Sequence, residues 1–448
     1  MFRRCVISCV VLILALHAPA RTRPHYGGTL RVETQGDPWQ RPDGIARELV
    51  FDGLTTFDAH GEVVPALATQ WSSDNNDHRW EFRLRSGVHF HDGTPLTSIN
   101  VVASLNAACP ANCPWTTVRA VGASVVFLGD APMPGLSALL ATDEFRIALT
   151  LTADGKPPGQ NIGTGPFQLA ASNNGVLSLT ANENCWQGRP FADSIEIRGH
   201  RDVRDQWLDL SVGRADVVEV PAEMLRQAQQ QRLNLALSPP VSLLALQIPD
   251  SGALGNPTLR ASIAASIDRI VLYNVIYQKQ GEVTASLLPQ SLTGYSFLFS
   301  TARDLNKAHE LRGGLSSPAL TLQVDGDGAM QLAAQRIALD LHEAGFNVQT
   351  ARSNGAHADL ELRKLPLVGS DPEAALDVLL RAAGFAAPPI DNTPAALFKA
   401  EQTILDQHTL LPLLDLPRGY ATSGRVRDLR LQADGTPDLA DASLEDAQ

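Results

Sequence analysis

The stretch that decides the fold lies between Gly61 and Gly93 and reads GEVVPALATQWSSDNNDHRWEFRLRSGVHFHDG. It starts with a glycine turn and a helical turn that begins at a proline, and the Asx-rich residues 74–77 predict a hairpin turn. The strand that follows alternates apolar residues, at positions 80, 82 and 84, with charged ones, so one of its faces should be buried. The stretch contains no acid–base pair, phosphate loop or metal cage, and it therefore predicts a structural role in a binding protein rather than catalysis.

The first twenty residues have the pattern of a secretory signal peptide. Arginines at 3 and 4 precede an apolar run at 5–16, and Ala-Pro-Ala at 18–20 is typical of a cleavage site. The run is short for a membrane span, although an uncleaved anchor is the alternative. No cysteine follows it where a lipoprotein signal would place one. We expect residues 1–20 to be removed and the mature protein to be periplasmic.

Composition limits the classes of partner. The net charge of −12 becomes −14 without the two leader arginines, which argues against nucleic acid or an anionic membrane as a partner. The roughly 430 remaining residues are enough for two or three domains. We expect a soluble monomer.

The mature chain has three cysteines, Cys109, Cys113 and Cys185. Cys109 and Cys113 could close a small disulfide loop in an exported compartment, and the alternative is that they stay reduced. Cys185 is expected to be a buried small hydrophobic residue rather than a reactive thiol.

The element pattern predicts an α/β protein. A strand at 320–324, a helix at 329–344 and a strand at 346–350 form a βαβ unit, which implies a parallel sheet. A long helix is predicted over 258–276, and an apolar return strand over 410–416.

Several short motifs occur in an order that resembles the extracellular solute-binding proteins of family 5, the dipeptide, oligopeptide and nickel-binding type that serves ABC importers. Each motif alone is weakly specific, and their collinearity carries the resemblance, which covers nearly the whole mature chain but weakens after about residue 285. The motifs are GGTL at 27–30, FDGL at 51–54, PALA at 65–68 with Trp71, FRLR at 82–85, FHDGTPLT at 90–97, GTGPF at 163–167, WQGRP at 186–190 and GRAD at 213–216.

This resemblance implies a two-lobed periplasmic-binding-protein clamp, type II-like, with an extra subdomain in lobe one. Lobe one would be residues 21–243, with the subdomain at about 46–162, completed by about 406–448. Lobe two would be residues 244–405. The ligand would lie in the cleft, which closes around it by hinge motion.

The resemblance also implies where a ligand would bind. The candidate residues are Gln35, Trp39, Gln40 and Arg41 after the first strand of lobe one, and Gln247, Val368 and Gly369 in lobe two. Gln247 is placed at the crossing between the lobes, and Val368 and Gly369 would offer only backbone groups. Peptide-binding members carry a carboxylate before the Asp-Pro pair for the amino terminus of the ligand. In the run from 365 to 372 no Asp precedes the Asp-Pro pair, and Asp371, which belongs to the pair itself, is expected to cap a helix.

Other chemistries are less favoured. His89 and His91 could bind nickel or copper from one strand face, but a turn at 91–93 is the preferred interpretation, and no metal or cofactor is expected. Glu33 and Asp37 could form an acid–base pair, although neither has a visible partner in the sequence.

Three functions remain open at this point. The favoured one is a periplasmic receptor that delivers a peptide or similar small solute to the permease of an ABC importer. The alternative is a degenerate solute-binding fold that acts as a binding or interaction module without transport, because lobe two is short and lacks the carboxylate. A secreted hydrolase is least favoured, since no nucleophile–base pair is recognisable.

Overall fold

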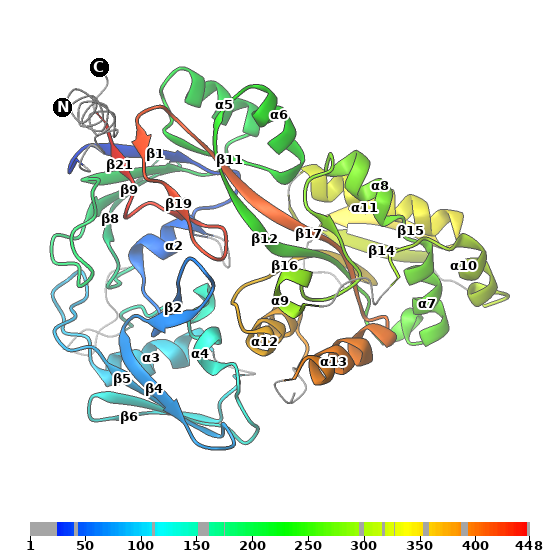
Figure 1. Cartoon of the computed structure of the whole chain (residues 1–448), viewed down its shortest axis with the longest axis horizontal. Coiled ribbons are helices and arrows are strands. Elements are labelled where there is room, and N and C mark those ends of the chain that lie inside the picture. The colour runs from blue at the N-terminus through cyan, green and yellow to red at the C-terminus, as the bar shows by residue number, and fades with distance from the viewer. Residues whose placement is uncertain are drawn as a thin grey trace, which may run out of the picture.

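The computed structural model describes residues 25–39, 44–109, 113–150, 161–173, 175–294, 300–315, 319–326, 328–352, 358–386 and 393–445. The predicted leader and two of the candidate site residues, Gln40 and Arg41, lie outside these ranges. Within them, one 11-stranded sheet has the order β15-β14-β16-β12-β17-β11-β1-β10-β9-β8, with β13 paired to β17. The sheet runs through both lobes (Figure 1), which confirms the two-lobed α/β fold.

Lobe one forms around parallel strands β1, β10 and β11, because β1 pairs in parallel with both of the others. Helix α2 and the C-terminal segment pack with the apolar side chains of one face, and α5 and α6 cover β11. The elements are β1 (Thr29–Glu33), α2 (Ile45–Val50), β8 (Phe167–Asn173), β9 (Val176–Ala181), β10 (Ser194–Arg198), α5 (Val203–Ser211), β11 (Val217–Val220), α6 (Leu225–Gln230), β18 (Val426–Arg427), β19 (Arg430–Leu431), β20 (Pro437–Asp438) and β21 (Ser443–Leu444).

The subdomain has its own antiparallel sheet, in the order β4-β5-β7-β6, and its own apolar core. The predicted alternating strand is β5, whose Trp80, Phe82 and Leu84 are buried. The helical turn predicted after Pro65 is wrong: a bend joins two strands there instead. The elements are β2 (Thr55–Phe57), β3 (Val63–Pro65), β4 (Ala68–Ser73), β5 (Arg79–Leu84), α3 (Ser98–Ala108), β6 (Thr117–Val121), β7 (Ser124–Leu128) and α4 (Leu136–Leu139).

Lobe two contains the predicted βαβ unit, since β14 and β15 pair in parallel across α11. Helices α7 and α11 pack on one face of the sheet, and α12 and α13 pack on the other. The elements are α7 (Pro257–Ser266), α8 (Arg269–Val271), the π-helix η4 (Leu272–Ile276), β13 (Glu282–Val283), α9 (Gln290–Thr293), α10 (Leu305–Arg312), β14 (Ala319–Val324), α11 (Gly328–Glu343), β15 (Asn347–Arg352), β16 (Leu360–Pro366), α12 (Pro372–Ala382) and α13 (Pro394–Asp406); short 3₁₀ turns lie at Asp143–Phe145, Ala222–Met224 and Gly252–Leu254.

The continuous helix predicted over 258–276 is wrong. Asp268 interrupts it: its side chain accepts the Val271 N–H, and its own N–H donates to buried Asp340 at 3.0 Å. A residue that caps a new helix takes a non-helical backbone, as Asp268 does with φ −92° and ψ 88°, so the chain breaks into α7, α8 and η4.

Two long strands, β12 (Asn234–Gln247) and β17 (Leu410–Thr422), connect the lobes (Figure 1). Their first pairs, Asn234 with Thr422 to Leu237 with Gly419, lie in lobe one, and register shifts follow at 237–242. Prolines at 239, 240 and 417 occupy this region, where they remove ladder hydrogen bonds. The crossing is thus the least regular part of the strand pair, which suits a hinge. The lobe limits at 243/244 and 405/406 stay predictions.

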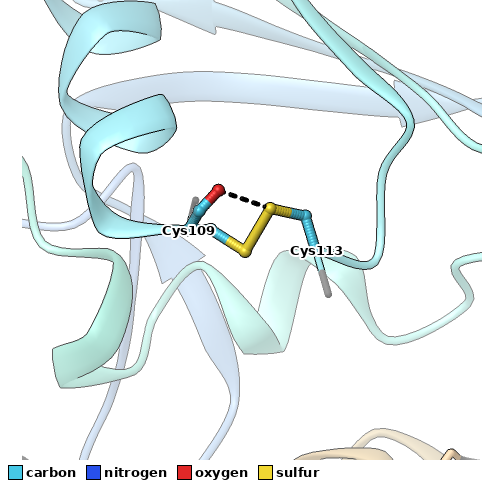
Figure 2. Close-up of a disulfide and its surroundings, with 2 residues drawn as sticks. All are labelled: Cys109 and Cys113. Atoms are coloured by element: carbon cyan, nitrogen blue, oxygen red, sulfur yellow. Dashed lines mark hydrogen bonds between the residues drawn. A yellow bond between two sulfur atoms is a disulfide. The ribbon is translucent and has the colours of Figure 1, made fainter. Parts of the chain in front are cut away.

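The structure joins Cys109 to Cys113 in a disulfide at the end of α3, with the two Cα atoms 5.7 Å apart (Figure 2). Cys185 is a buried free cysteine. Burial raises the pKa of its thiol, so Cys185 has the character of a core residue rather than a nucleophile.

Candidate functional site

The GTGPF run at 163–167 is the joint between the subdomain and lobe one. The Nδ1 atom of His91 accepts the Gly163 N–H at 3.3 Å, and the Nε2 atom lies 3.0 Å from the carbonyl oxygen of Gly165. Both ring nitrogens are satisfied by a neutral imidazole with its proton on Nε2, and burial lowers the His91 pKa. His91 therefore holds two segments together and is not available as a metal ligand in this arrangement.

Buried Asp52 fixes the same joint from the other side. Its Oδ2 atom accepts hydrogen bonds from Thr164 Oγ1 at 2.7 Å and from Trp186 Nε1 at 2.9 Å. FDGL, HDG, GTGPF and WQG, four of the motifs that suggested the family, thus meet at one structural node. Their role here is to position the subdomain.

Gln35 and Trp39 lie in the loop that follows β1, at the carboxyl ends of the parallel strands. Ligands of open α/β sheets commonly bind at this edge. The Gln35 N–H donates to Glu219 Oε2 at 2.7 Å, and the half-buried Trp39 ring lies 6.4 Å from the Phe51 ring. Both candidates lie in this one loop, and their contact with a ligand remains a prediction.

Glu33 and Asp37 have structural partners. Arg198 and Arg201 lie 3.4 and 3.7 Å from the carboxylate of Glu33, which is buried, and burial raises its pKa. Asp37 accepts the Trp39 N–H at 2.9 Å. Glu33 thus lies in a charged cluster with two arginines, and Asp37 holds the backbone of its own loop.

The placement of Gln247 at the crossing is wrong. Gln247 is the last residue of β12, and its side chain donates to the Ala383 carbonyl oxygen and accepts from Arg363. It pairs with Glu361 at the start of β16, whereas Val368 follows the other end of that strand. A strand rises about 3.3 Å per residue, so Gln247 and Val368 lie roughly 20 Å apart along β16. The sequence motif could not show how far β12 extends past the crossing.

Val368 and Gly369 form a contact between lobe two and the subdomain. The Val368 side chain is 7% exposed and packs in the subdomain core, and the Ser370 N–H donates to the Gly61 carbonyl oxygen at 2.9 Å. A Cβ atom on Gly61 would lie 3.1 Å from the backbone of Gly369, so the two glycines permit the approach. In this structure the segment closes one side of the clamp. The predicted role of Asp371 as a helix cap is confirmed by its bond to the Ala374 N–H at 2.9 Å.

Replacing Val368 with Asp is expected to separate lobe two from the subdomain. A carboxylate in this apolar contact would cost about 3 kcal/mol or more unless water reaches it. We expect a larger radius of gyration for the unliganded variant by small-angle X-ray scattering. Val275→Asp, at a lobe-two position that is 58% exposed, is the control and should scatter like the wild type. Identical scattering from the two variants would contradict the role of Val368 in holding lobe two against the subdomain.

Asp415, which the sequence patterns did not single out, has an unusual environment in β17. It is 2% exposed, and its Oδ1 atom is buried without a hydrogen-bond partner in the part of the chain that the structure describes. Burial, together with the charges of Glu282 and Glu401, raises its pKa to about 8. The only sequence signal is one acidic residue within the apolar run LLPLLDL.

Within the described ranges, no three His, Cys, Asp or Glu side chains are grouped as metal ligands. The same ranges contain no helix that is long and apolar enough to cross a membrane.

The sequence match settles the family. Residues 62–364 match the bacterial extracellular solute-binding proteins, family 5, in their middle part. The chain belongs to this family. The strands that match, from β3 to β16, include the subdomain sheet and most of lobe two.

Individual relatives of this family 5 protein are distant. The peptide transport periplasmic protein SapA of Salmonella typhimurium (strain LT2) is 23% identical over 458 residues, covering 85% of this chain and 83% of that protein. The uncharacterized protein YhjP of Bacillus subtilis (strain 168) is 33% identical over 172 residues, covering 36% of this chain and 29% of that protein. The binding protein AgaA of A. tumefaciens R10, solved with agropinic acid, has a TM-score of 0.81 at 18% identity, covering 94% and 99% of the two chains.

Proposed function

We propose that this family 5 protein is the periplasmic receptor of an ABC importer, and that it captures a peptide or similar small solute and delivers it to the permease subunits. The observation that carries the proposal is the pair of lobes joined by β12 and β17, whose register shifts and prolines at the crossing suit a hinge. Family membership supports the same function. Family 5 proteins bind peptides or small molecules and work with ABC permeases.

Two relatives and the chemistry of strand pairing support the class of solute. SapA, which aligns over most of both chains, is named as a peptide transport protein, and AgaA was solved with agropinic acid. An extended peptide can pair with strand edges through its backbone, which gives affinity with little dependence on its side chains. We therefore place peptides first and small polar solutes second.

One observation favours the interaction module as the second candidate. Val368 packs into the subdomain core, so a direct apolar contact joins lobe two to the subdomain on one side of the clamp. A protein that stays closed would bind partners by its surface rather than a solute in its cleft. The distinguishing property is opening and closing in solution.

A thermal-shift screen of the mature protein, followed by scattering, tests the proposal. Di- and tripeptides, oligopeptides, sugars, nickel and haem form the panel, because a solute that binds only the folded state raises the midpoint by mass action. The expected result is a shift with a peptide or small polar solute and a smaller radius of gyration in its presence. No shift with any member, and a constant radius, would favour the interaction module.

Trp39→Ala is expected to weaken solute binding about tenfold or more without unfolding the protein. The ring is half-buried and packs with Phe51, so its loss removes an aromatic surface at the edge of β1 but leaves the core of lobe one intact. Calorimetric titration of a solute from the panel measures the loss, and circular dichroism checks the fold. Trp71→Ala, in the subdomain sheet, is the control. An unchanged affinity in folded Trp39→Ala would contradict the placement of Trp39 in the ligand site.

A further inference from the structure

We propose that the C-terminal hairpin restrains the hinge, so that the two lobes move apart only when the tip of this hairpin separates from the crossing strands. The hairpin consists of β19 and β20, and its tip is the turn at 432–436. Strand β19 is in contact with β12, and the hairpin lies beside the crossing (Figure 1). The proposal goes beyond the receptor function, because it concerns the motion of the lobes and holds for any solute.

The tip touches both crossing strands at a glycine. Gly435 is buried and has a φ of 80°, a left-handed conformation that glycine adopts without strain. A Cβ atom at this position would lie 2.9 Å from Cγ2 of Val241 in β12 and 3.1 Å from Cβ of Arg418 in β17. The lack of a side chain therefore allows this close approach, at the place where prolines 239, 240 and 417 interrupt the strand pair.

The hairpin itself is bound to lobe one. Leu431 of β19 and Leu439, directly after β20, pack in the apolar core around α2. The turn is closed by Asp434, whose Oδ1 atom accepts the N–H of Thr436 at 2.9 Å and its hydroxyl at 2.6 Å. The tip is thus held in place by lobe one.

Val241, which the tip touches, is bound to lobe two. Its carbonyl oxygen accepts the Leu367 N–H at 2.9 Å, and the next residue, Ser242, pairs with Pro366 at the end of β16. The Val241 side chain is 4% exposed, although among the described residues it belongs to none of the apolar cores of the lobes or the subdomain. The contact between Gly435 and Val241 therefore joins lobe one to lobe two.

This contact favours the arrangement of the lobes in this structure. A contact that exists at one angle between the lobes and is lost at others stabilises that angle. Separation of the tip from Val241 would expose the valine side chain to water, which is unfavourable. The hairpin therefore opposes opening of the hinge, and removal of the contact should make other lobe angles more populated.

The test measures the distance between the lobes in the protein without solute. Spin labels at Ser211→Cys on α5 and Gln335→Cys on α11, both exposed, report this distance by double electron–electron resonance, and Cys185 is buried away from the label. In Val241→Ala the population of other lobe angles is expected to rise up to about tenfold, because each lost methyl group contributes a factor of roughly four to such an equilibrium. Val118→Ala, at a buried position in the subdomain strand β6, is the control and should keep the wild-type distribution.

Gly435→Ala gives a second test, because it inserts the Cβ atom that would overlap Val241 and Arg418. Its matched control is Gly213→Ala, since Gly213 also has a positive φ, 72°, but a Cβ atom there would meet nothing within 4 Å. Both alanines are strained, and only Gly435→Ala should move the mean distance between the labels. Wild-type distributions in Val241→Ala and Gly435→Ala, with the fold verified by circular dichroism, would overturn the proposal. Equal changes in the two controls would overturn it as well, and either result leaves the receptor function standing.

Discussion

Replacing Gly163 with alanine is expected to destabilise the protein by roughly 3 kcal/mol or more, a large fraction of the about 5–15 kcal/mol by which folded proteins are usually stable. A Cβ atom at this position would overlap the carbonyl oxygen of Val50 and lie 2.7 Å from Cδ1 of Phe51. The conflict involves the backbone of α2, so no change of rotamer relieves it. The Gly163 N–H also donates to His91, and a shift of the loop would break that bond.

The measurement is chemical denaturation followed by circular dichroism, with Gly424→Ala as the control. Gly424 is exposed, and a Cβ atom there would meet nothing within 4 Å. The control should stay within about 0.5 kcal/mol of the wild type. Equal stability of the two variants would show that the GTGPF run does not fix the joint between the subdomain and lobe one.

The second large effect is a pH-dependent gain of stability in Asp415→Asn. In the folded protein the Asp415 pKa is raised from 3.8 to about 8. The unfolded chain loses this proton above about pH 4, whereas the folded protein keeps it up to about pH 8. The unfolded state is therefore favoured as the pH rises through this window, by up to about 1.4 kcal/mol per pH unit, or roughly 4 kcal/mol between pH 4 and pH 7.

Asparagine cannot ionise in the folded or the unfolded state, so the variant does not lose this stability as the pH rises. We expect melting temperatures close to those of the wild type near pH 4 and several degrees higher at pH 8, measured by differential scanning calorimetry without solute. Asp304→Asn removes an equal charge from an exposed helix cap and should follow the wild type at every pH. If the melting temperatures of the wild type and Asp415→Asn change in parallel with pH, the raised pKa of Asp415 is contradicted.

The sequence predicted the elements whose burial follows a simple period. The alternation at 80–84 is confirmed as β5, and the βαβ unit at 320–350 is confirmed as β14, α11 and β15. Thr97, a residue type that commonly caps helices, accepts the Asn100 N–H at the start of α3. In these segments each side chain is buried by its own sheet or helix layer, and the pattern along the chain records that burial.

Local pattern failed where a distant residue decides the backbone. Asp340, far along the chain, holds the N–H of Asp268 and helps to break the helix predicted over 258–276. The family resemblance placed Gln247 at the crossing between the lobes, near a ligand, but its side chain bonds to Arg363 and to the Ala383 carbonyl oxygen at the far end of β12. Neither partner is visible from the sequence around the residue itself.

The sequence by itself determined the α/β class, because glycines, prolines and alternating apolar residues specify turns and strands locally. The collinear motifs carried the resemblance to family 5, and that resemblance implied the two-lobed architecture. The sequence also showed that no carboxylate precedes the Asp-Pro pair at 371–372, a run in which Val368 and Gly369 were expected to offer only backbone groups to a ligand. Only the tertiary structure decided what that valine does, because its burial depends on the subdomain packing against lobe two. The same holds for Asp415: the sequence shows one acidic residue in an apolar run, and only the pairing of the strands buries its side chain.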